Sequence, residues 1–291
     1  MKKTENYKTG DSSSTGNSSS TGNSSKAAVS DGAVIRKRLV TAFGAVAAIC
    51  ILIAWLFTAM QFVCYHDYDM YIEEYEKYGV LSDMPAGVKL RGENSLYTVT
   101  EHMMKYLIGD KDTPDLQCSI DTAEGTRDFF VERELLHMAD CRVLFRKALQ
   151  LRYICVMLAI FLFVYSKYAI LRDGNAAAPR FLKKEEQLRC SSHPFAEGMK
   201  IGTAVFFIFA AAIAAYFVFN FSTAFVQFHL IFFDNDLWLL DPRESLLINI
   251  LPEGFFFDMV KKILAVYLPG VVLLLVLVFI RTKKCFRSSA G

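Results

Sequence analysis

Residues 39–63 read LVTAFGAVAAICILIAWLFTAMQFV, an apolar run without a single charged side chain. A helix needs about 20 such residues to cross the hydrocarbon core of a bilayer. The run is too long for the apolar region of a cleaved signal peptide, and it begins too far from the first residue. We therefore predict a permanent membrane-spanning helix here.

Three further apolar runs follow, at about 149–171, 201–225 and 263–280. Hydrophobic residues make up 53% of the 291-residue chain, and the mean hydropathy is +0.28. This is too apolar for an ordinary soluble domain. The pattern predicts an all-α membrane protein with four transmembrane helices. Gly202 and the alanines of the third run predict that neighbouring helices approach closely there.

Basic residues predict the orientation. One group precedes the first run, at Arg36, Lys37 and Arg38, another lies between the second and third runs, and a last group follows the fourth. Cytoplasmic segments of membrane proteins carry an excess of lysine and arginine. Both termini are therefore predicted to be cytoplasmic, and the loops at 66–147 and 226–262 to face outward. A basic cluster around Arg146, at the outer end of the second run, predicts contact with anionic headgroups or acidic partners.

The remaining organisation follows from composition. In residues 1–33 the hexapeptide SSSTGN occurs twice in tandem, with few apolar side chains nearby. Such a segment buries too little surface to offset its ordering entropy, so we predict a disordered tail. The membrane domain is then predicted to cover 36–283. Of the seven cysteines, only Cys118 and Cys141 lie in the long outer loop, so a disulfide between them stays open.

The outer loop at 66–147 predicts a small α+β region. TVTEHMMKYLIG, at 98–109, is amphipathic and ends in glycine, which is typical of a short helix. LQCSI and RDFFV flank DTAEGT and predict a hairpin. VERELLHMADCRVLFRKAL, at 131–149, runs into the second span with His137 on one face. We expect it to lie along the membrane interface with its leucines in the headgroup region, rather than to extend the span as a straight rod.

Two histidines far apart in sequence are predicted to meet at one depth of the outer leaflet. His229 stands where the third span leaves the membrane, and His137 lies in the interfacial segment. Each has carboxylates nearby, and acidic groups so close to a bilayer are costly unless they pair or do chemistry. Candidate orienting or substrate-binding residues are Asp140, Asn235, Asp236, Trp238 and Asp241.

Other interpretations stay open from these residues alone. A single interfacial histidine is more often the polar tip of an amphipathic surface than a catalytic group. The chain could be a non-enzymatic membrane scaffold or sensor whose acidic outer loop binds a partner. It could also be a metal-dependent membrane hydrolase that uses both histidines with Asp140 or Asp236, although the histidines lack the short spacing of a zincin.

Longer blocks of sequence point to one family. FFVERELLHMADCRVLF, FHLIFFDNDLWLLDP, LPEGFFFDM and IEEYEKYGV resemble the signature blocks of the bacterial lipoprotein intramolecular transacylases. The resemblance runs from about 36 to 283 and leaves out only the Ser-rich tail. Cys141 stands where the family commonly has an aliphatic residue.

The resemblance implies a multi-pass protein of the bacterial cell membrane that acts on diacylated lipoproteins within membrane lipid. The implied reaction moves the sn-2 acyl chain of the diacylglyceryl group onto the α-amine of the same cysteine. The product is a lyso-form N-acyl lipoprotein. His137 and His229 are the implied catalytic residues, with no cofactor, no metal and no nucleic acid.

Overall fold

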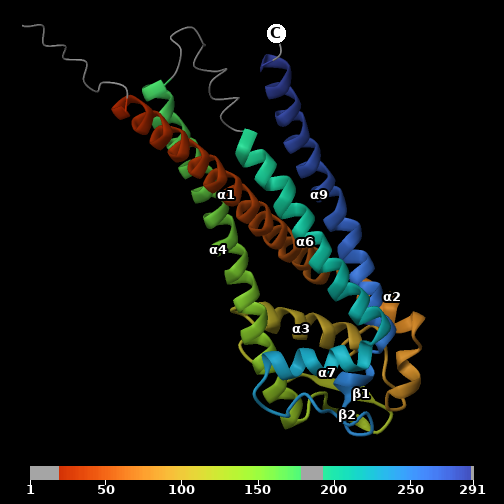
Figure 1. Ribbon diagram of the computed structural model, residues 1–291. Helices are drawn as coiled ribbons and strands as arrows, with labels where there is room; N and C mark the ends of the chain where they lie inside the picture. Colours follow the sequence, from red (N-terminus) through yellow and green to blue (C-terminus); the bar gives the residue numbers. More distant parts are fainter. Residues whose placement is uncertain (1–19, 178–192, 290–291) are drawn as a thin grey trace, which may run out of the picture.

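Four long apolar helices form the body of the protein (Figure 1). The computed structural model describes the backbone of residues 20–177 and 193–289, and side chains over 34–169, 194–278 and at Ile280. Within these ranges the long helices are α1 (Ser20–His66), α4 (Glu132–Ala177), α6 (His193–Phe219) and α9 (Glu253–Ser289). The predicted helical membrane protein with four spans is confirmed. The direction in which the spans cross the membrane stays a prediction.

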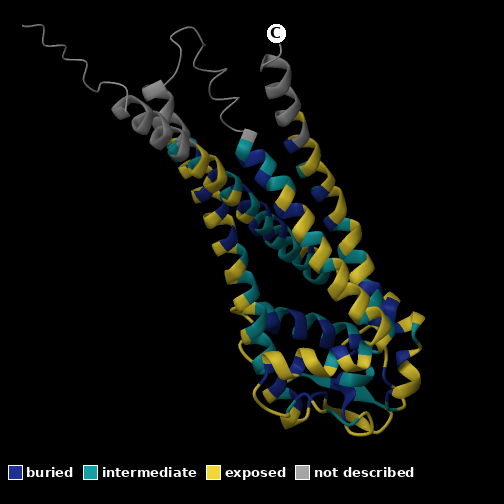
Figure 2. Cartoon of the chain, viewed as in Figure 1, coloured by how far each residue is buried: buried dark blue, intermediate teal, exposed yellow. Residues whose placement is uncertain are grey.

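The outer surfaces of these helices are apolar, as lipid contact requires. Large hydrophobic side chains stand exposed along α4, α6 and α9, among them Ile154, Phe209 and Val272, and Figure 2 shows exposed residues running along each helix. A water-soluble monomer rarely exposes apolar patches of this size. Toward the inside, one cluster of buried side chains joins α1 to α4 and α6, and another joins α1 to α9 and α6.

The first helix extends further toward the N-terminus than its apolar run. α1 begins at Ser20, inside the segment predicted to be disordered, and residues 1–19 lie outside the described part of the chain. Propagating a helix adds one hydrogen bond for each residue fixed, so a stable span can extend into weakly helical sequence.

A glycine pair lets α1 and α6 cross in close contact. A Cβ added at Gly198 would lie 1.9 Å from the carbonyl oxygen of Thr41, and one at Gly202 would lie 2.2 Å from that of Ala45. These glycines are four residues apart, the spacing of the GxxxG packing motif. The sequence predicted close approach from Gly202, but Ala204 and most of the alanines of this span are exposed.

Replacing Gly198 or Gly202 with leucine is expected to prevent stable folding of the membrane domain. The atoms in the way are backbone atoms of α1, which cannot rotate aside, so the helices must separate. The measurement is the yield of monodisperse protein after detergent extraction. Ala204→Leu, on the exposed side of the same helix, is the control and is expected to behave as the unaltered protein. Equal yields from all three variants contradict this account of the crossing.

Beyond the ends of the spans lies a small domain built from both long loops. It contains α2 (Asp69–Lys77), a 3-10 turn η1 (Val80–Asp83), α3 (Leu96–Ile108) and the short helix α8 (Leu246–Asn249). The predicted hairpin is present as β1 (Ser119–Thr122) and β2 (Gly125–Asp128), antiparallel, with Thr122 opposite Gly125. α3 ends at Gly109 in the left-handed conformation, as its sequence predicted. One hydrophobic core joins the loops, with Tyr75, Phe129 and Ile250 almost fully buried.

The segment before the second span does not lie along an interface. α4 is one helix of 46 residues, so His137 stands on a continuous extension of the span, and the predicted interfacial segment at 131–149 is wrong. No glycine or proline interrupts 132–171, so the backbone hydrogen bonds continue without a break. The apolar face that was assigned to lipid packs instead on the core of the small domain, through Leu135 and Met138.

A helix with an apolar outer face follows the third span. α6 ends at Phe219, earlier than the predicted boundary at 225, because Asn220 leaves the helical conformation at φ −141° and ψ 46°. α7 (Phe221–Phe232) then runs across the end of the bundle (Figure 1). Its outer face is strongly apolar, with Ile231 76% exposed, whereas Ala224 and His229 face inward and are buried. This division of faces is typical of a helix that lies in a membrane interface.

Candidate active site

The two histidines singled out by the sequence meet where α7 crosses α4. The ring centroids of His137 and His229 are 5.8 Å apart, with an interplanar angle of 37°. Each residue is only 7% exposed. The continuous α4 carries His137 beyond the apolar stretch at 149–171, and the turn at Asn220 brings α7 back over it. Two titratable rings thus share one enclosed space.

Aromatic side chains form the walls of this space. The ring of Phe225 lies 4.2 Å from that of His229, and the indole of Trp238 stacks on the same imidazole at 4.7 Å. Phe233 contacts both histidines, at 5.1 Å from His137 and 5.6 Å from His229. Aromatic walls exclude water and lower the local dielectric, which strengthens any polar interaction inside.

One hydrogen bond fixes the tautomer of His229. Its Nδ1 lies 2.7 Å from the backbone carbonyl oxygen of Phe225. A carbonyl oxygen only accepts hydrogen bonds, so Nδ1 must carry the proton and donate. In the neutral ring Nε2 then holds the lone pair, and no hydrogen bond to it occurs among the described residues. His229 therefore keeps a basic nitrogen without a hydrogen-bond partner among the described residues.

His137 has one occupied and one free nitrogen. Its Nε2 lies 3.5 Å from the thiol sulfur of Cys141, one turn along α4. Its Nδ1 is buried and has no hydrogen-bond partner among the described residues. A buried polar atom without a partner costs free energy and is often found where a substrate supplies the missing contact.

Burial keeps both rings neutral. The pKa of His137 is lowered to about 4, chiefly by burial and also by the nearby His229, while Asp140 acts in the opposite direction. The pKa of His229 is also lowered by burial, against the effect of its hydrogen bond to Phe225. Both imidazoles are thus uncharged near pH 7 and able to act as base or as hydrogen-bond donor.

Asp140 and the loop after α7 are joined by hydrogen bonds rather than by contact with a histidine. The amide of Asn235 donates to the carboxylate of Asp140 over 2.8 Å, and the indole nitrogen of Trp238 donates to the backbone carbonyl of Asn235 over 3.0 Å. These bonds hold the ring of Trp238 against His229. Asp140, Asn235 and Trp238 therefore belong to the surroundings of the histidine pair.

The other two predicted residues are held elsewhere. Asp236 pairs with Arg133 at 3.3 Å, and Asp241 forms a surface pair with Arg243 at 2.6 Å. The carboxylate of Asp241 is thus engaged by its own loop. Sequence proximity to His229 suggested both residues, but each carboxylate is paired with an arginine instead.

Sequence reasoning missed Glu134, which is fully buried one turn before His137. Its carboxylate accepts from the backbone N–H of Val131 over 2.8 Å, from that of Leu247 over 3.0 Å and from the hydroxyl of Ser245. Glu134 thereby caps the start of α4 and joins the second loop to this helix. The detectable signal was a glutamate three residues into a helix, the position that caps the first turn.

Three further observations concern the thiols, possible metal binding and a cavity among the helices. Cys118 and Cys141 are both free thiols, and within the described ranges no group of three or more His, Cys, Asp or Glu side chains is placed to hold a metal ion. A cavity of about 640 Å³ lies among α1, α4, α6 and α9, but neither histidine lines it.

Comparison with models of known protein families finds a match to one family. The model of the family "Lipoprotein intramolecular transacylase Lit" matches residues 45–256. The comparison with curated proteins finds no match.

Solved structures give the same fold. The structure of the membrane integral lipoprotein intramolecular transacylase Lit from Bacillus cereus is 22% identical, with a TM-score of 0.56, over 85% of this chain and 96% of that one. A histidine-to-arginine variant of the Bacillus cereus protein matches at 22% identity and a TM-score of 0.58, over 91% and 99% of the two chains. A histidine-to-alanine variant matches at 21% identity and a TM-score of 0.57, over 85% and 94%.

The matched segment, 45–256, contains both histidines, the second and third spans and most of the first. Together with the shared fold, it establishes that this chain belongs to the lipoprotein intramolecular transacylase family and is a membrane acyltransferase of lipoprotein maturation.

Proposed function

We propose that the chain moves the sn-2 acyl chain of a diacylglyceryl-cysteine lipoprotein to the α-amine of the same cysteine, at the outer leaflet. The observation that carries this is the enclosed pair of neutral imidazoles, each with a nitrogen free for a substrate. The outward orientation rests on the basic residues, and the depth rests on the apolar outer face of α7.

His229 serves as the general base. As the cysteine nitrogen attacks the carbonyl carbon of the sn-2 ester, the lone pair on Nε2 accepts a proton from that nitrogen. The hydrogen bond from Nδ1 to the carbonyl of Phe225 stabilises the imidazolium that forms. When the bond to glycerol breaks, the same Nε2 delivers its proton to the departing oxygen. The products are an amide and a secondary alcohol, and no proton is gained or lost.

His137 serves as the oxyanion donor. When the thiol of Cys141 donates to Nε2 of His137, the ring proton resides on Nδ1. That N–H is buried and unpaired, so it can donate to the negative oxygen of the tetrahedral intermediate. A donor that is already desolvated loses no further water as charge develops. Family membership implies catalysis by the two histidines, and this assignment gives each one a separate task.

Tethering supplies much of the rate. Donor ester and acceptor amine belong to one lipid-modified cysteine, so binding one of them holds the other nearby, which replaces an encounter between two molecules. Asp140, Asn235 and Trp238 orient the pair, because together they hold the indole against His229. The salt bridges of Asp236 and Asp241 shape the loop, and we assign neither residue to the substrate.

The rate at low substrate concentration is expected to rise with pH through the pKa of the substrate amine, which for a free α-amine is about 7.7–8.0. Both histidines are already neutral at that point, because burial lowers their pKa values. The pKa values of both histidines lie below the ordinary imidazole value of about 6.5. The histidines are therefore protonated only at a more acidic pH, and activity is expected to fall there. A pH–rate profile on a synthetic lipopeptide tests this. An inflection near 6.5 as the main feature contradicts the neutral pair.

The alternative of a non-enzymatic scaffold predicts a different result. Lipoproteins from a strain that expresses the chain are compared by tandem mass spectrometry with those from a strain without it. Conversion of diacyl to lyso-form N-acyl lipoprotein that depends on the chain supports the enzyme. Unchanged lipoproteins, together with a stable protein partner in a pull-down, favour the scaffold.

A further inference from the structure

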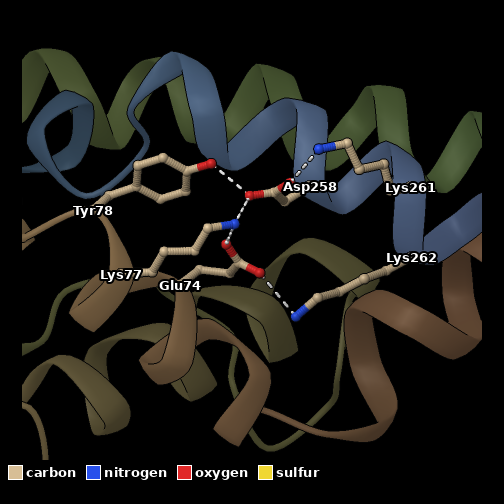
Figure 3. Close-up of polar contacts among 6 residues, drawn as sticks. All are labelled: Glu74, Lys77, Tyr78, Asp258, Lys261 and Lys262. Carbon is tan, nitrogen blue, oxygen red and sulfur yellow. Dashed lines mark hydrogen bonds and ion pairs between the residues drawn. The ribbon is translucent and has the colours of Figure 1, made fainter.

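Two of the sequence blocks that resemble the family have no task in this chemistry, and they meet in space. IEEYEKYGV, at 72–80, forms most of α2 and the turn after it, and LPEGFFFDM, at 251–259, opens α9. Figure 3 shows polar side chains from the two segments pointing toward one another. The contact joins the small domain to the start of the fourth span.

Two buried carboxylates organise this contact. Asp258 is 7% exposed and Glu74 is 4% exposed. Asp258 accepts from Lys77, from the hydroxyl of Tyr78 over 2.5 Å and from Lys261 over 2.9 Å. Glu74 pairs with Lys262 at 2.9 Å and with Lys77 at 3.6 Å. Lys77 therefore bridges both carboxylates, and α2 and α9 are fixed in one register.

A glycine allows the two segments to come this close. A Cβ added at Gly254 would lie 2.3 Å from a ring carbon of Tyr78. The ring of Tyr78 thus lies directly on the backbone of α9 while its hydroxyl reaches Asp258, one turn further along. Tyr78 therefore contacts the first turns of α9 at two points.

The first turns of α9 in turn support α7. Phe257 contacts the ring of Phe221 at 5.3 Å, and Phe256 contacts Phe221 at 5.9 Å and Phe225 at 6.3 Å. Phe225 then meets His229 twice, through its ring at 4.2 Å and through its carbonyl oxygen at 2.7 Å. An unbroken series of contacts therefore leads from Asp258 to the imidazole of His229.

We infer that Asp258 and Tyr78 are positioning residues, which hold the start of α9 so that Phe256 and Phe225 aim Nε2 of His229 at the substrate. The inference rests on the proposed function, because it assumes that His229 is the base. Ionic contacts suit this task, since an ion pair with several partners specifies one register where apolar packing tolerates sliding. A displacement of about 1 Å at a reacting group can cost about 100-fold in rate.

The test compares Tyr78→Phe and Asp258→Asn with a control that removes a different ion pair of α2. Tyr78→Phe keeps the ring on Gly254 and removes only the hydroxyl. Arg91→Met removes the exposed pair between Arg91 and Asp69 at the start of α2, and it is expected to leave both kinetic constants unchanged. We expect kcat to fall about 10-fold to 100-fold in the Asp258 variant and less in the Tyr78 variant, with KM close to that of the unaltered protein. The rates are measured below the thermal midpoint of each variant, because removal of the buried charge lowers the stability of the Asp258 variant.

A double variant separates positioning from general stability. If Asp258 acts through His229, then Asp258→Asn added to His229→Ala lowers the residual rate no further, because coupled residues are not additive. An equal loss in both backgrounds overturns the inference, as does an unchanged kcat in the Asp258 and Tyr78 single variants. Full activity of His229→Ala alone overturns the proposed function instead, so the two failures are distinguishable.

Discussion

Replacing His229 with alanine is expected to reduce acyl transfer by about 100-fold to 10,000-fold, the range that a lost general acid–base group commonly costs. His137→Ala is expected to lose about 100-fold to 1,000-fold, the cost of removing one oxyanion donor. The measurement is the initial rate of conversion of a synthetic diacylglyceryl lipopeptide by the purified protein. Substrate affinity is expected to change little, since both contacts strengthen only in the transition state.

His102→Ala is the matched control for both variants. His102 lies on α3, where its Nε2 contacts the backbone carbonyl of Asp115 over 3.1 Å, and it takes no part in the site. Its removal is expected to leave the rate within a factor of two or so, about 0.4 kcal/mol in the barrier. If His102→Ala loses as much activity as His229→Ala, the losses reflect damage to the fold and the assigned roles are wrong.

A large loss of stability is also expected from Glu134→Ala. Its buried carboxylate accepts from two backbone N–H groups and one hydroxyl. Each buried donor left without a partner costs about 1–3 kcal/mol, so the expected loss is about 3 kcal/mol or more. Glu134→Gln retains one acceptor oxygen and is expected to lose less.

Unfolding of the detergent-solubilised protein measures this effect. Glu132→Ala is the control, because Glu132 is exposed in the same first turn of α4 and contributes about 0.3–1 kcal/mol through the helix dipole. Glu134→Ala is also expected to lower activity, since it releases the loop of Ser245 and Leu247 from the helix that carries His137. Equal unfolding free energies for the Glu134 and Glu132 variants contradict the role of the buried carboxylate.

The spans and the hairpin were predictable because their signals are local. Twenty or so apolar residues leave a helix in lipid as the only way to satisfy the backbone. The turn that contains Gly125 and the left-handed Gly109 likewise depend on residues within one turn of them. These elements form wherever the rest of the chain lies.

The relation of α4 to α7 was not predictable in the same way. The apolar face of 131–149 has the pattern of an interfacial helix, and the same pattern serves a helix that packs on a domain core. The choice is made by the α3 helix and the loop around Ile250, which cover that face. Conversely, the break at Asn220 shortens the third span and turns the next stretch into the interfacial helix, which a continuous apolar run of sequence conceals.

The same difference between local and long-range signals applies to the site. The sequence predicted that His137 and His229 reach a similar depth, but it did so from an interfacial segment at 131–149 that the structure does not have. They meet because the continuous α4 carries His137 beyond the span and α7 turns back over it. The partners of the acids were not predicted, since Arg133 reaches Asp236 and Asn235 reaches Asp140 only after the second loop folds against α4. The role of Glu134 could not be predicted from the sequence, because its partners Ser245 and Leu247 are more than a hundred residues away along the chain.

Intramolecular transfer is the central claim, and it leaves the mass of the lipopeptide unchanged, because the acyl chain only changes its place. A crossover experiment therefore tests it most directly. The purified protein receives a mixture of two diacylglyceryl lipopeptides that differ in peptide, one of them with deuterated acyl chains, and fragment ions locate each chain. Intramolecular transfer predicts N-acyl, lyso-glyceryl products in which every peptide keeps its own label, formed about 100-fold to 10,000-fold more slowly by His229→Ala. Products that exchange labels between peptides, or conversion by the His229 variant at the unaltered rate, would contradict it.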